Sequence, residues 1–284
     1  MGTVVGGFVL PHVPLMFTAP TAPAEAVRQR IRDAYAQVAR RLAALRATSV
    51  VVIGTDHYIN LGPRCLPQYL IAVGDVDGPA ERLPGLDRMP LPDDRALARH
   101  IAAHGHLSGL DWAVAKTFTA DHSVAIPHRL AVAPAGLPVV PVVLACGVEP
   151  LLPPARAAAV GEGIRAAVEA WDDDARVAVI GSGGISHWVG TAEMGRINSA
   201  FDERVLALVT DGDVPGLCAF DNAEVAREAG NGAWEIRTFI AALAAVGPCR
   251  GEVIAYEAVP AWITGMGFAE VTPLSEPAAR AGAA

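Results

Sequence analysis

Three segments of the sequence end in a histidine that could bind a metal ion or transfer a proton. They are GGFVLPH, which ends at His12, SVVVIGTDH, which ends at His57, and ARVAVIGSGGISH, which ends at His187. Each contains an apolar, β-branched run of the kind that forms a buried strand. Open α/β sheets bind ligands beyond the carboxyl ends of their strands, so we expect the three imidazoles at one edge of a sheet.

Each of these histidines also has a structural interpretation. A single buried imidazole is more often a core or turn residue bonded to a backbone carbonyl than a ligand. Three strands that each deliver an imidazole to the same edge favour a functional site instead. Small residues beside them predict room for a ligand and permit unusual backbone angles. These residues are Gly54, Gly181, Gly183 and Gly184.

A metal at this edge would also need a carboxylate. NGAWEIRTFIAAL offers Glu235 near the start of a predicted helix, beside its apolar stripe. The structural interpretation of Glu235 is a first-turn acid favoured by the helix dipole. Two histidines and one carboxylate, with open positions on the metal, form the ligand set of non-haem Fe(II) oxygenases.

Other histidines are weaker candidates. His122 lies in TFTADHS, which we interpret as a polar, loop-like setting, and His128 follows Pro127 and either lines the pocket or occupies a turn. His100 and His104 have a spacing that can bind metal, with His106 close behind, but the sequence lacks the glutamate of a zincin HExxH motif. We interpret those three as part of a solvated helix end.

The glycine-rich segment GSGG at 181–184 matches neither of two common motifs. Ser186 stands where a dinucleotide-binding GxGxxG motif needs its third glycine. Ile180 stands where the GxSxG motif of α/β-hydrolases needs its first.

The elements that must position these residues alternate in type. Predicted strands are Val4–Leu10, Ser49–Ile53, Tyr69–Val73, Val139–Leu144, Ala175–Ile180 and Glu252–Tyr256. Predicted helices are Pro23–Ala47, Asp94–Ala103, Leu152–Ala170, Gly195–Thr210, Asp221–Ala229 and Gly232–Ala245. The pattern predicts an α/β fold with a single domain, a mixed sheet covered by helices, and an active site at the carboxyl ends of the strands.

No linker divides the chain. The segment Asp75–Asp94 contains several Pro, Gly and acidic residues and is predicted to be a loop. We predict one domain over residues 1–272 and a disordered tail, rich in Ala and Pro, over 273–284.

Composition argues against nucleic-acid binding, membrane association and secretion. The 284 residues carry a net charge of −8, which disfavours a nucleic-acid or anionic-membrane partner. Apolar runs are too short to span a membrane, and the amino terminus reaches His12 without a basic residue, so no signal peptide is expected. The four scattered cysteines then predict reduced thiols and a cytoplasmic location.

Taken together, the motifs resemble those of a known family, the class III extradiol dioxygenases. The resemblance rests on LPHVPLM, GTDHYIN, TADHSVAIPH, GSGGISHWVG and GNGAWEIRTFIAAL, in the family's order, from His12 to Leu243. GSGGxSH and the early PH together are fairly specific, whereas either alone would be weak. The resemblance implies an α/β catalytic domain that inserts both atoms of O2 and opens the ring of a catechol-type substrate.

The resemblance also implies a role for each candidate residue. His12, His57 and Glu235 would hold Fe(II), and His187 would act as acid and base. His122 would be a second active-site histidine, oriented by the preceding Asp121. Expected partners are a small aromatic substrate and O2, within a homo-oligomer that could include a second subunit.

One departure from the family pattern bears on the substrate. Some members follow the SH with Gln and a residue leading to Pro, whereas Trp188 and Val189 follow His187 here. An aminophenol or a hydroxylated heterocycle therefore stays open beside a catechol. A zinc-type metallohydrolase would use the same ligands to activate water. A non-catalytic subunit is a further alternative, which the presence of all five candidate site residues disfavours.

Overall fold

The central strands are apolar along their length because helices cover both faces of the sheet. The computed structural model describes residues 1–55, 57–171 and 174–274. Strands β2 (Ser49–Thr55) and β6 (Val139–Leu144) are buried at every position, and β7 (Arg176–Ser182) at all but its first. Uniformly apolar strands of this kind belong to sheets that are covered on both sides. The predicted α/β class is confirmed.

The sheet mixes parallel and antiparallel pairs, as predicted. Its strand order is β4-β3-β6-β2-β7-β1-β9-β8, and β5 pairs with β3. The four strands β6, β2, β7 and β1 run parallel to one another, while β3 and β9 pair antiparallel with β6 and β1. The other strands are β1 (Thr3–Leu10), β3 (Tyr69–Gly78), β4 (Met89–Pro90), β5 (Ala113–Thr119), β8 (Cys249–Val259) and β9 (Thr264–Pro273).

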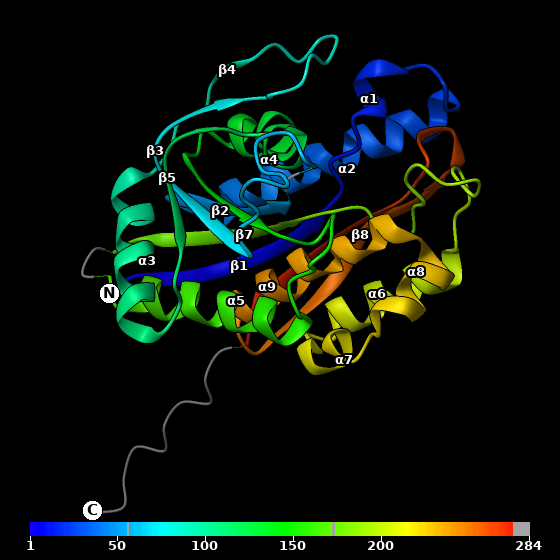
Figure 1. Cartoon of the computed structure of the whole chain (residues 1–284). Helices are drawn as coiled ribbons and strands as arrows, with labels where there is room; N and C mark the ends of the chain where they lie inside the picture. The colour runs from blue at the N-terminus through cyan, green and yellow to red at the C-terminus, as the bar shows by residue number, and fades with distance from the viewer. Residues whose placement is uncertain (56, 172–173, 275–284) are drawn as a thin grey trace, which may run out of the picture.

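Helices pack on the two faces of this sheet (Figure 1). Helices α2 and α4 belong to one apolar core, and α3, α5 and α9 to the other, together with α6, α7 and α8 near the strands of the C-terminal half. The helices are α1 (Leu15–Thr18), α2 (Glu25–Ala44), α3 (Arg95–Ser108), α4 (His122–Pro127), α5 (Pro154–Glu169), α6 (Ser199–Thr210), α7 (Val214–Cys218), α8 (Asn222–Ala229) and α9 (Ile236–Val246).

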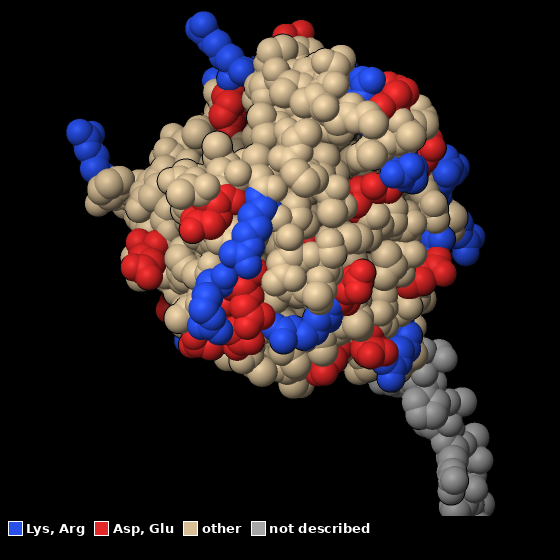
Figure 2. Space-filling model, turned by 90° about the vertical axis from the view of Figure 1, so that its right-hand side faces the viewer, with Lys and Arg blue, Asp and Glu red and all other residues tan. Residues whose placement is uncertain are grey.

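Figure 2 views the side of the molecule toward which the parallel strands point. Uncharged residues cover the top and centre of this face, and basic and acidic side chains lie around and below them. Within the part of the chain that the structure describes, no helix is long and apolar enough to cross a membrane.

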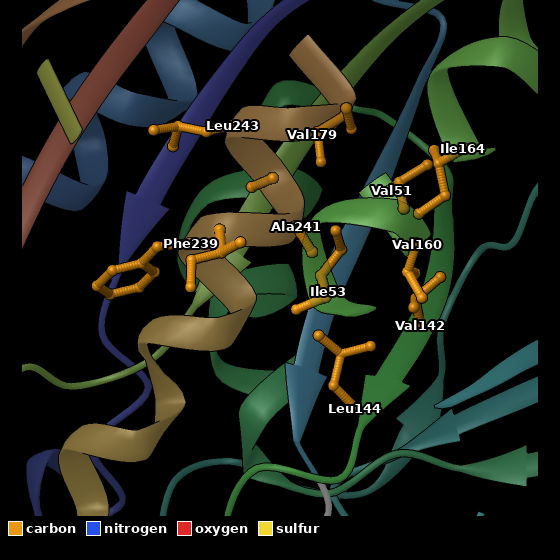
Figure 3. Packing of buried hydrophobic residues seen from close by; sticks show 14 of the residues in the cluster. Val51, Ile53, Val142, Leu144, Val160, Ile164, Val179, Phe239, Ala241 and Leu243 are labelled. Atoms are coloured by element: carbon orange, nitrogen blue, oxygen red, sulfur yellow. The ribbon is translucent and has the colours of Figure 1, made fainter. Parts of the chain in front are cut away.

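Helix α9 fixes the position of the residue that precedes it. Every residue of α9 is buried, and Phe239 and Leu243 belong to the same core as Val179 of β7 (Figure 3). Burying one such side chain stabilises a fold by about 1.5–3 kcal/mol, so α9 is held firmly against the sheet. Its N-terminal end, where Glu235 lies, is therefore held as well.

Most predicted elements are confirmed, with ends that differ by a few residues. The helix predicted over Gly232–Ala245 is wrong at its start, because residues Asn231–Glu235 form a 3₁₀ turn and α9 begins at Ile236. The loop predicted over Asp75–Asp94 is wrong in part, since β3 continues to Gly78 and β4 follows.

Three strands, β4, β5 and β9, and three short helices were not predicted. Strand β9 contains Gly265 and Gly267, which lower strand propensity. Its pairing with β1 and β8 stabilises the strand in place of local propensity. Helices α1, α4 and α7 are too short to show a helical period. Pro273, the first residue of the predicted tail, ends β9, and from residue 275 onward the predicted tail lies outside the described residues.

Candidate metal centre and active site

The three histidines that follow the predicted strands lie at one edge of the sheet, as expected. Strands β2, β7 and β1 are adjacent and parallel, so their carboxyl ends meet. His12 follows β1, His57 follows β2, and His187 follows β7. All three line one cavity.

This cavity has a volume of about 190 Å³. Pockets for drug-sized ligands measure about 300–1,000 Å³, so the space suits a smaller molecule. Four histidines and Glu235 supply the titratable groups of the lining, and the other lining residues are apolar or small. The lining residues are His12, Val13, Pro14, Leu15, His57, His122, Gly184, His187, Val189, Glu235, Ile263 and Thr264.

A wider groove of about 920 Å³ lies along β3, β4 and β5. Its charged side chains are paired with one another, Arg88 with Asp77 and Arg95 with Asp75 and Asp93. It contains none of the candidate histidines, and we assign it no chemistry.

The His12 ring has a defined proton position. Its Nδ1 lies 2.8 Å from Ser182 Oγ, and that hydroxyl donates its proton to the Ser123 carbonyl. The hydroxyl must therefore accept from Nδ1–H, which leaves the lone pair on Nε2. Nε2 lies 3.3 Å from Glu235 Oε1.

The His57 ring is held in the same way by a carboxylate. Its Nδ1 lies 2.8 Å from Asp121 Oδ2, which also accepts the His57 backbone N–H at 3.0 Å. Its Nε2 lies 3.2 Å from Glu235 Oε1. A carboxylate behind a histidine fixes the tautomer and makes Nε2 a better metal ligand.

Glu235 is buried, with 3% of its surface exposed, and Oε2 accepts the Gly184 N–H at 2.8 Å. Burial raises the pKa of this carboxyl, but His12 and His57 outweigh burial and hold the pKa well below its ordinary value. Burial lowers the pKa of His57, yet Asp121 and Glu235 raise it to about 10. The buried carboxylates thus favour a positive charge between them.

These three side chains fit a divalent metal. Two imidazole Nε2 atoms and one carboxylate oxygen converge, a donor set that suits Fe(II) and leaves other positions open. His122 is a neighbouring imidazole, and one nitrogen from each of His12, His57 and His122 lies within 4.8 Å of the others. His12, His57 and His122 are therefore an alternative set of metal ligands on geometric grounds.

His187 lies on the other side of Glu235. Its Nδ1 lies 3.0 Å from the Ile185 carbonyl, which can only accept, so Nδ1 donates and Nε2 keeps a lone pair when the ring is neutral. Nε2 lies 3.8 Å from Glu235 Oε2. The backbone N–H of His187 donates to the Ala229 carbonyl at 2.8 Å, which anchors the segment to the end of α8.

The interpretation of Asp121 as the partner of His122 is wrong. The Asp121 carboxylate binds His57 and the Ser123 N–H, the latter as the N-cap of α4. The His122 ring instead binds Glu81, with Nδ1 2.5 Å from Oε1. His122 also begins α4, so the loop-like setting predicted for it is corrected.

The glycines near the strand ends do not leave the room that the sequence suggested. A Cβ at Gly54 would meet Ser123, one at Gly181 the Thr238 backbone, and one at Gly183 Glu235. Gly184 does line the cavity, but a Cβ there would meet Thr264 and His187. None of these four lies in the left-handed backbone region, so the glycines serve close packing of site residues.

His128 and His100 lie outside the cavity lining. His128 is buried in the π-helical turn His128–Val132 and is not among the cavity-lining residues, which favours its interpretation as a turn residue. His100 Nε2 binds the Ala167 carbonyl at 2.8 Å, and its ring contacts Trp171. Of the two residues after His187, Val189 lines the cavity, while buried Trp188 stacks with Arg196.

Two functional partners were missed in the sequence. Ser182 is the last residue of β7 and pairs with Leu10 at the end of β1, and this position is the signal that points to His12. Glu81 lies in the segment that we predicted to be a loop, where no local signal pointed to His122.

Comparisons with known proteins agree on one family. The family model described as the catalytic LigB subunit of aromatic ring-opening dioxygenase matches residues 6–267. The chain is 30% identical to the 2,3-dihydroxyphenylpropionate/2,3-dihydroxicinnamic acid 1,2-dioxygenase of Paraburkholderia phymatum, over 90% of this chain and 93% of that protein. It is 26% identical to the protein of the same name from Rhodococcus jostii, over 93% and 97%.

A solved structure has the same fold. The crystal structure of uncharacterized protein JW3007 from Escherichia coli K12 superposes with a TM-score of 0.60, covering 94% of this chain and 99% of that one. The two sequences are 16% identical, so this likeness concerns the fold alone.

Proposed function

The chain belongs to the family of the catalytic LigB subunit of aromatic ring-opening dioxygenases, and from that membership we propose that it is a non-haem Fe(II) extradiol dioxygenase. In this proposal His12, His57 and Glu235 hold the iron, and the enzyme adds both atoms of O2 to a catechol-type ring and opens it. One observation carries the proposal: two imidazoles with fixed tautomers direct Nε2 toward the same buried carboxylate oxygen.

A bound metal would supply the electron transfer that the protein side chains of the site do not provide. Bound ferrous iron would exchange single electrons between the substrate and O2, and three protein ligands leave positions for both. The protein atoms that would hold it are Nε2 of His12, Nε2 of His57 and a Glu235 carboxylate oxygen, with Ser182 and Asp121 behind the two rings.

His187 is the proton-transfer group in this proposal. Its Nδ1–H is occupied by the Ile185 carbonyl, so proton exchange with the substrate occurs at Nε2, beside Glu235. An imidazole suits both acceptance and donation near neutral pH. It would take a proton from a substrate hydroxyl and return one when the ring opens. His122 would hydrogen bond to a substrate or dioxygen oxygen.

The cavity and the relatives support a small aromatic substrate. The small volume suits a single aromatic ring, and Val13, Leu15 and Ile263 supply apolar surface that excludes water from it. The curated relatives are named for a catechol with a carboxylated side chain. We propose a catechol as the substrate here, with aminophenols and hydroxylated heterocycles as the compounds to test beside it.

Oxygen consumption tests the proposal. Protein loaded anaerobically with Fe(II) should consume one O2 per substrate with some member of a panel of catechols and aminophenols, and a ring-opened product should absorb visible light. Glu235→Ala should abolish both iron binding and uptake. Glu203→Ala, which removes an exposed carboxylate on α6, should leave both unchanged.

Two results would count against it. Activity that requires zinc and not O2 would favour a zinc-type metallohydrolase that uses the same ligands to activate water. Full iron binding by Glu235→Ala would contradict the proposed ligand set.

A further inference from the structure

The connection between β3 and β4 runs beside the segment that carries the second active-site histidine. The Ala80 N–H donates to the Ala120 carbonyl at 2.8 Å, and the Ala120 N–H donates to the Asp77 carbonyl at 2.7 Å. Leu83 and Leu86 then bury their side chains in the core. This connection is therefore fixed on both sides of residue 81.

Glu81 uses that position to bind His122. Its Oε1 lies 2.5 Å from His122 Nδ1 and 3.4 Å from the His122 backbone nitrogen. The Glu81 side chain is 18% exposed, and among the described residues its other oxygen, Oε2, is buried without a hydrogen-bond partner. The hydrogen bonds of the Glu81 carboxylate among the described residues therefore go to His122, through Oε1.

We propose that Glu81 is a positioning residue for the ring-opening reaction. A carboxylate accepts hydrogen bonds, so it places the His122 proton on Nδ1 and leaves Nε2 for the cavity that the ring lines. His122 then presents one defined nitrogen to a bound substrate or O2. This inference rests on the proposed dioxygenase function and adds Glu81 to its machinery.

The orientation needs a restraint because His122 lies so close to the candidate metal ligands. Its ring stacks on His57 with centroids 4.0 Å apart and 24° between the planes. The nitrogens of His12, His57 and His122 are near enough to bind one ion together. A carboxylate that holds Nδ1 opposes rotation of His122 and so keeps the ring in its place beside the metal.

Steady-state kinetics of the iron-loaded enzyme test the inference. Glu81→Ala should lower kcat by about 10- to 100-fold, with KM and iron content nearly unchanged, because orienting partners have effects of that size. Glu81→Gln keeps an acceptor oxygen and should recover most of the loss. Asp87→Ala removes an exposed carboxylate from the same connection and should match the wild type. Wild-type kcat in Glu81→Ala would overturn the inference.

A second readout does not depend on turnover. In zinc-loaded protein labelled with ¹⁵N-histidine, the nuclear magnetic resonance spectrum should show His122 protonated on Nδ1 in the wild type and Glu81→Gln. In Glu81→Ala that tautomer should be lost or mixed. An unchanged His122 tautomer in Glu81→Ala would overturn the inference even if no substrate were ever found. Failure of wild-type O2 uptake would instead count against the proposed function alone.

Discussion

The distance from each Nε2 atom to Glu235 distinguishes the two proposed metal histidines from the histidine proposed to transfer protons. Ser182 and Asp121 hold His12 and His57 so that both Nε2 atoms meet Glu235 Oε1. His187 is held by a backbone carbonyl, and its Nε2 lies 3.8 Å from the other carboxylate oxygen. A ring in that place can reach a bound substrate without being part of the ligand set.

We therefore expect opposite defects from two alanine substitutions. His57→Ala removes a ligand and should abolish iron binding and, with it, activity. His187→Ala should keep about one iron per chain and lose about 10²- to 10⁴-fold in kcat, the usual contribution of an acid–base group. Metal analysis beside single-turnover kinetics distinguishes the two.

A matched control is available on α3, where His106 is exposed. His106→Ala should keep both iron and turnover. If His187→Ala lost iron while His57→Ala kept it, the two roles would have to be exchanged.

His128 predicts an acid sensitivity that is independent of catalysis. Burial, and to a lesser degree Arg129, lowers the pKa of His128 from 6.5 to about 4. Between those values the unfolded chain binds a proton that the folded chain does not, so stability is complete above pH 6.5 and falls as the pH drops toward 4. At pH 5 the loss from this residue should be about 2 kcal/mol.

Urea unfolding at pH 7.5 and 5.0 measures that loss. His128→Leu should lose less stability between the two pH values than the wild type does, by about 2 kcal/mol. Comparing the two proteins in the same metal state cancels the contribution of the other histidines. Equal losses would show that His128 is protonated in the folded protein.

The packing of the 3₁₀ turn before α9 determines where the His187 ring can lie. Gly232 belongs to this turn, and its N–H donates to the His187 carbonyl at 3.1 Å. A Cβ at position 232 would lie 2.2 Å from His187 Cδ2 and Nε2, far inside van der Waals contact. The absence of a side chain at Gly232 thus leaves the space that the His187 imidazole occupies.

Gly232→Ala should therefore displace the ring and lower kcat by about 10²-fold, while iron content and the far-ultraviolet circular dichroism spectrum stay unchanged. Gly62→Ala is a suitable control, because its Cβ would make an ordinary 3.4 Å contact with Tyr58. Wild-type turnover in Gly232→Ala would mean that His187 can act from another rotamer.

The strands that end at the candidate site were predicted to within two residues at each end. Strands β1, β2 and β7 have long β-branched runs, and their parallel order brings their ends together. Strand β5 alternates buried and exposed residues too weakly to stand out, and α4 spans only six residues with Pro127 inside it. Local patterns fail where pairing with distant segments, more than propensity, forms the element.

Over the whole molecule, the contacts between distant segments were the part that could not be predicted. Asp121 precedes His122 in sequence, yet it binds His57 across 64 positions, and His122 binds Glu81 across 41. Residue types and strand ends give the candidates for a site. Which carboxylate lies behind which imidazole depends on how the sheet and its connections fold together.

The cavity gives a prediction about substrate choice. Val189 is 48% exposed and lines the cavity, on a chain whose relatives are named for a carboxylated catechol. An arginine at this rim could bind such a carboxylate, and a hydrogen bond to a charged group contributes about 1.5–3 kcal/mol. Val189→Arg should therefore raise kcat/KM for a carboxylated catechol, relative to its uncharged alkyl analogue, by about 10-fold.

Val189→Leu separates the effect of charge from that of size, and it should leave the ratio of the two kcat/KM values near that of the wild type. The gain in Val189→Arg should also shrink at high salt, because an exposed ion pair is screened. Equal ratios in both variants would mean that the substrate's side chain leaves the cavity away from Val189. The position of Val189 directly after His187 and Trp188 would then have no bearing on which ring the enzyme opens.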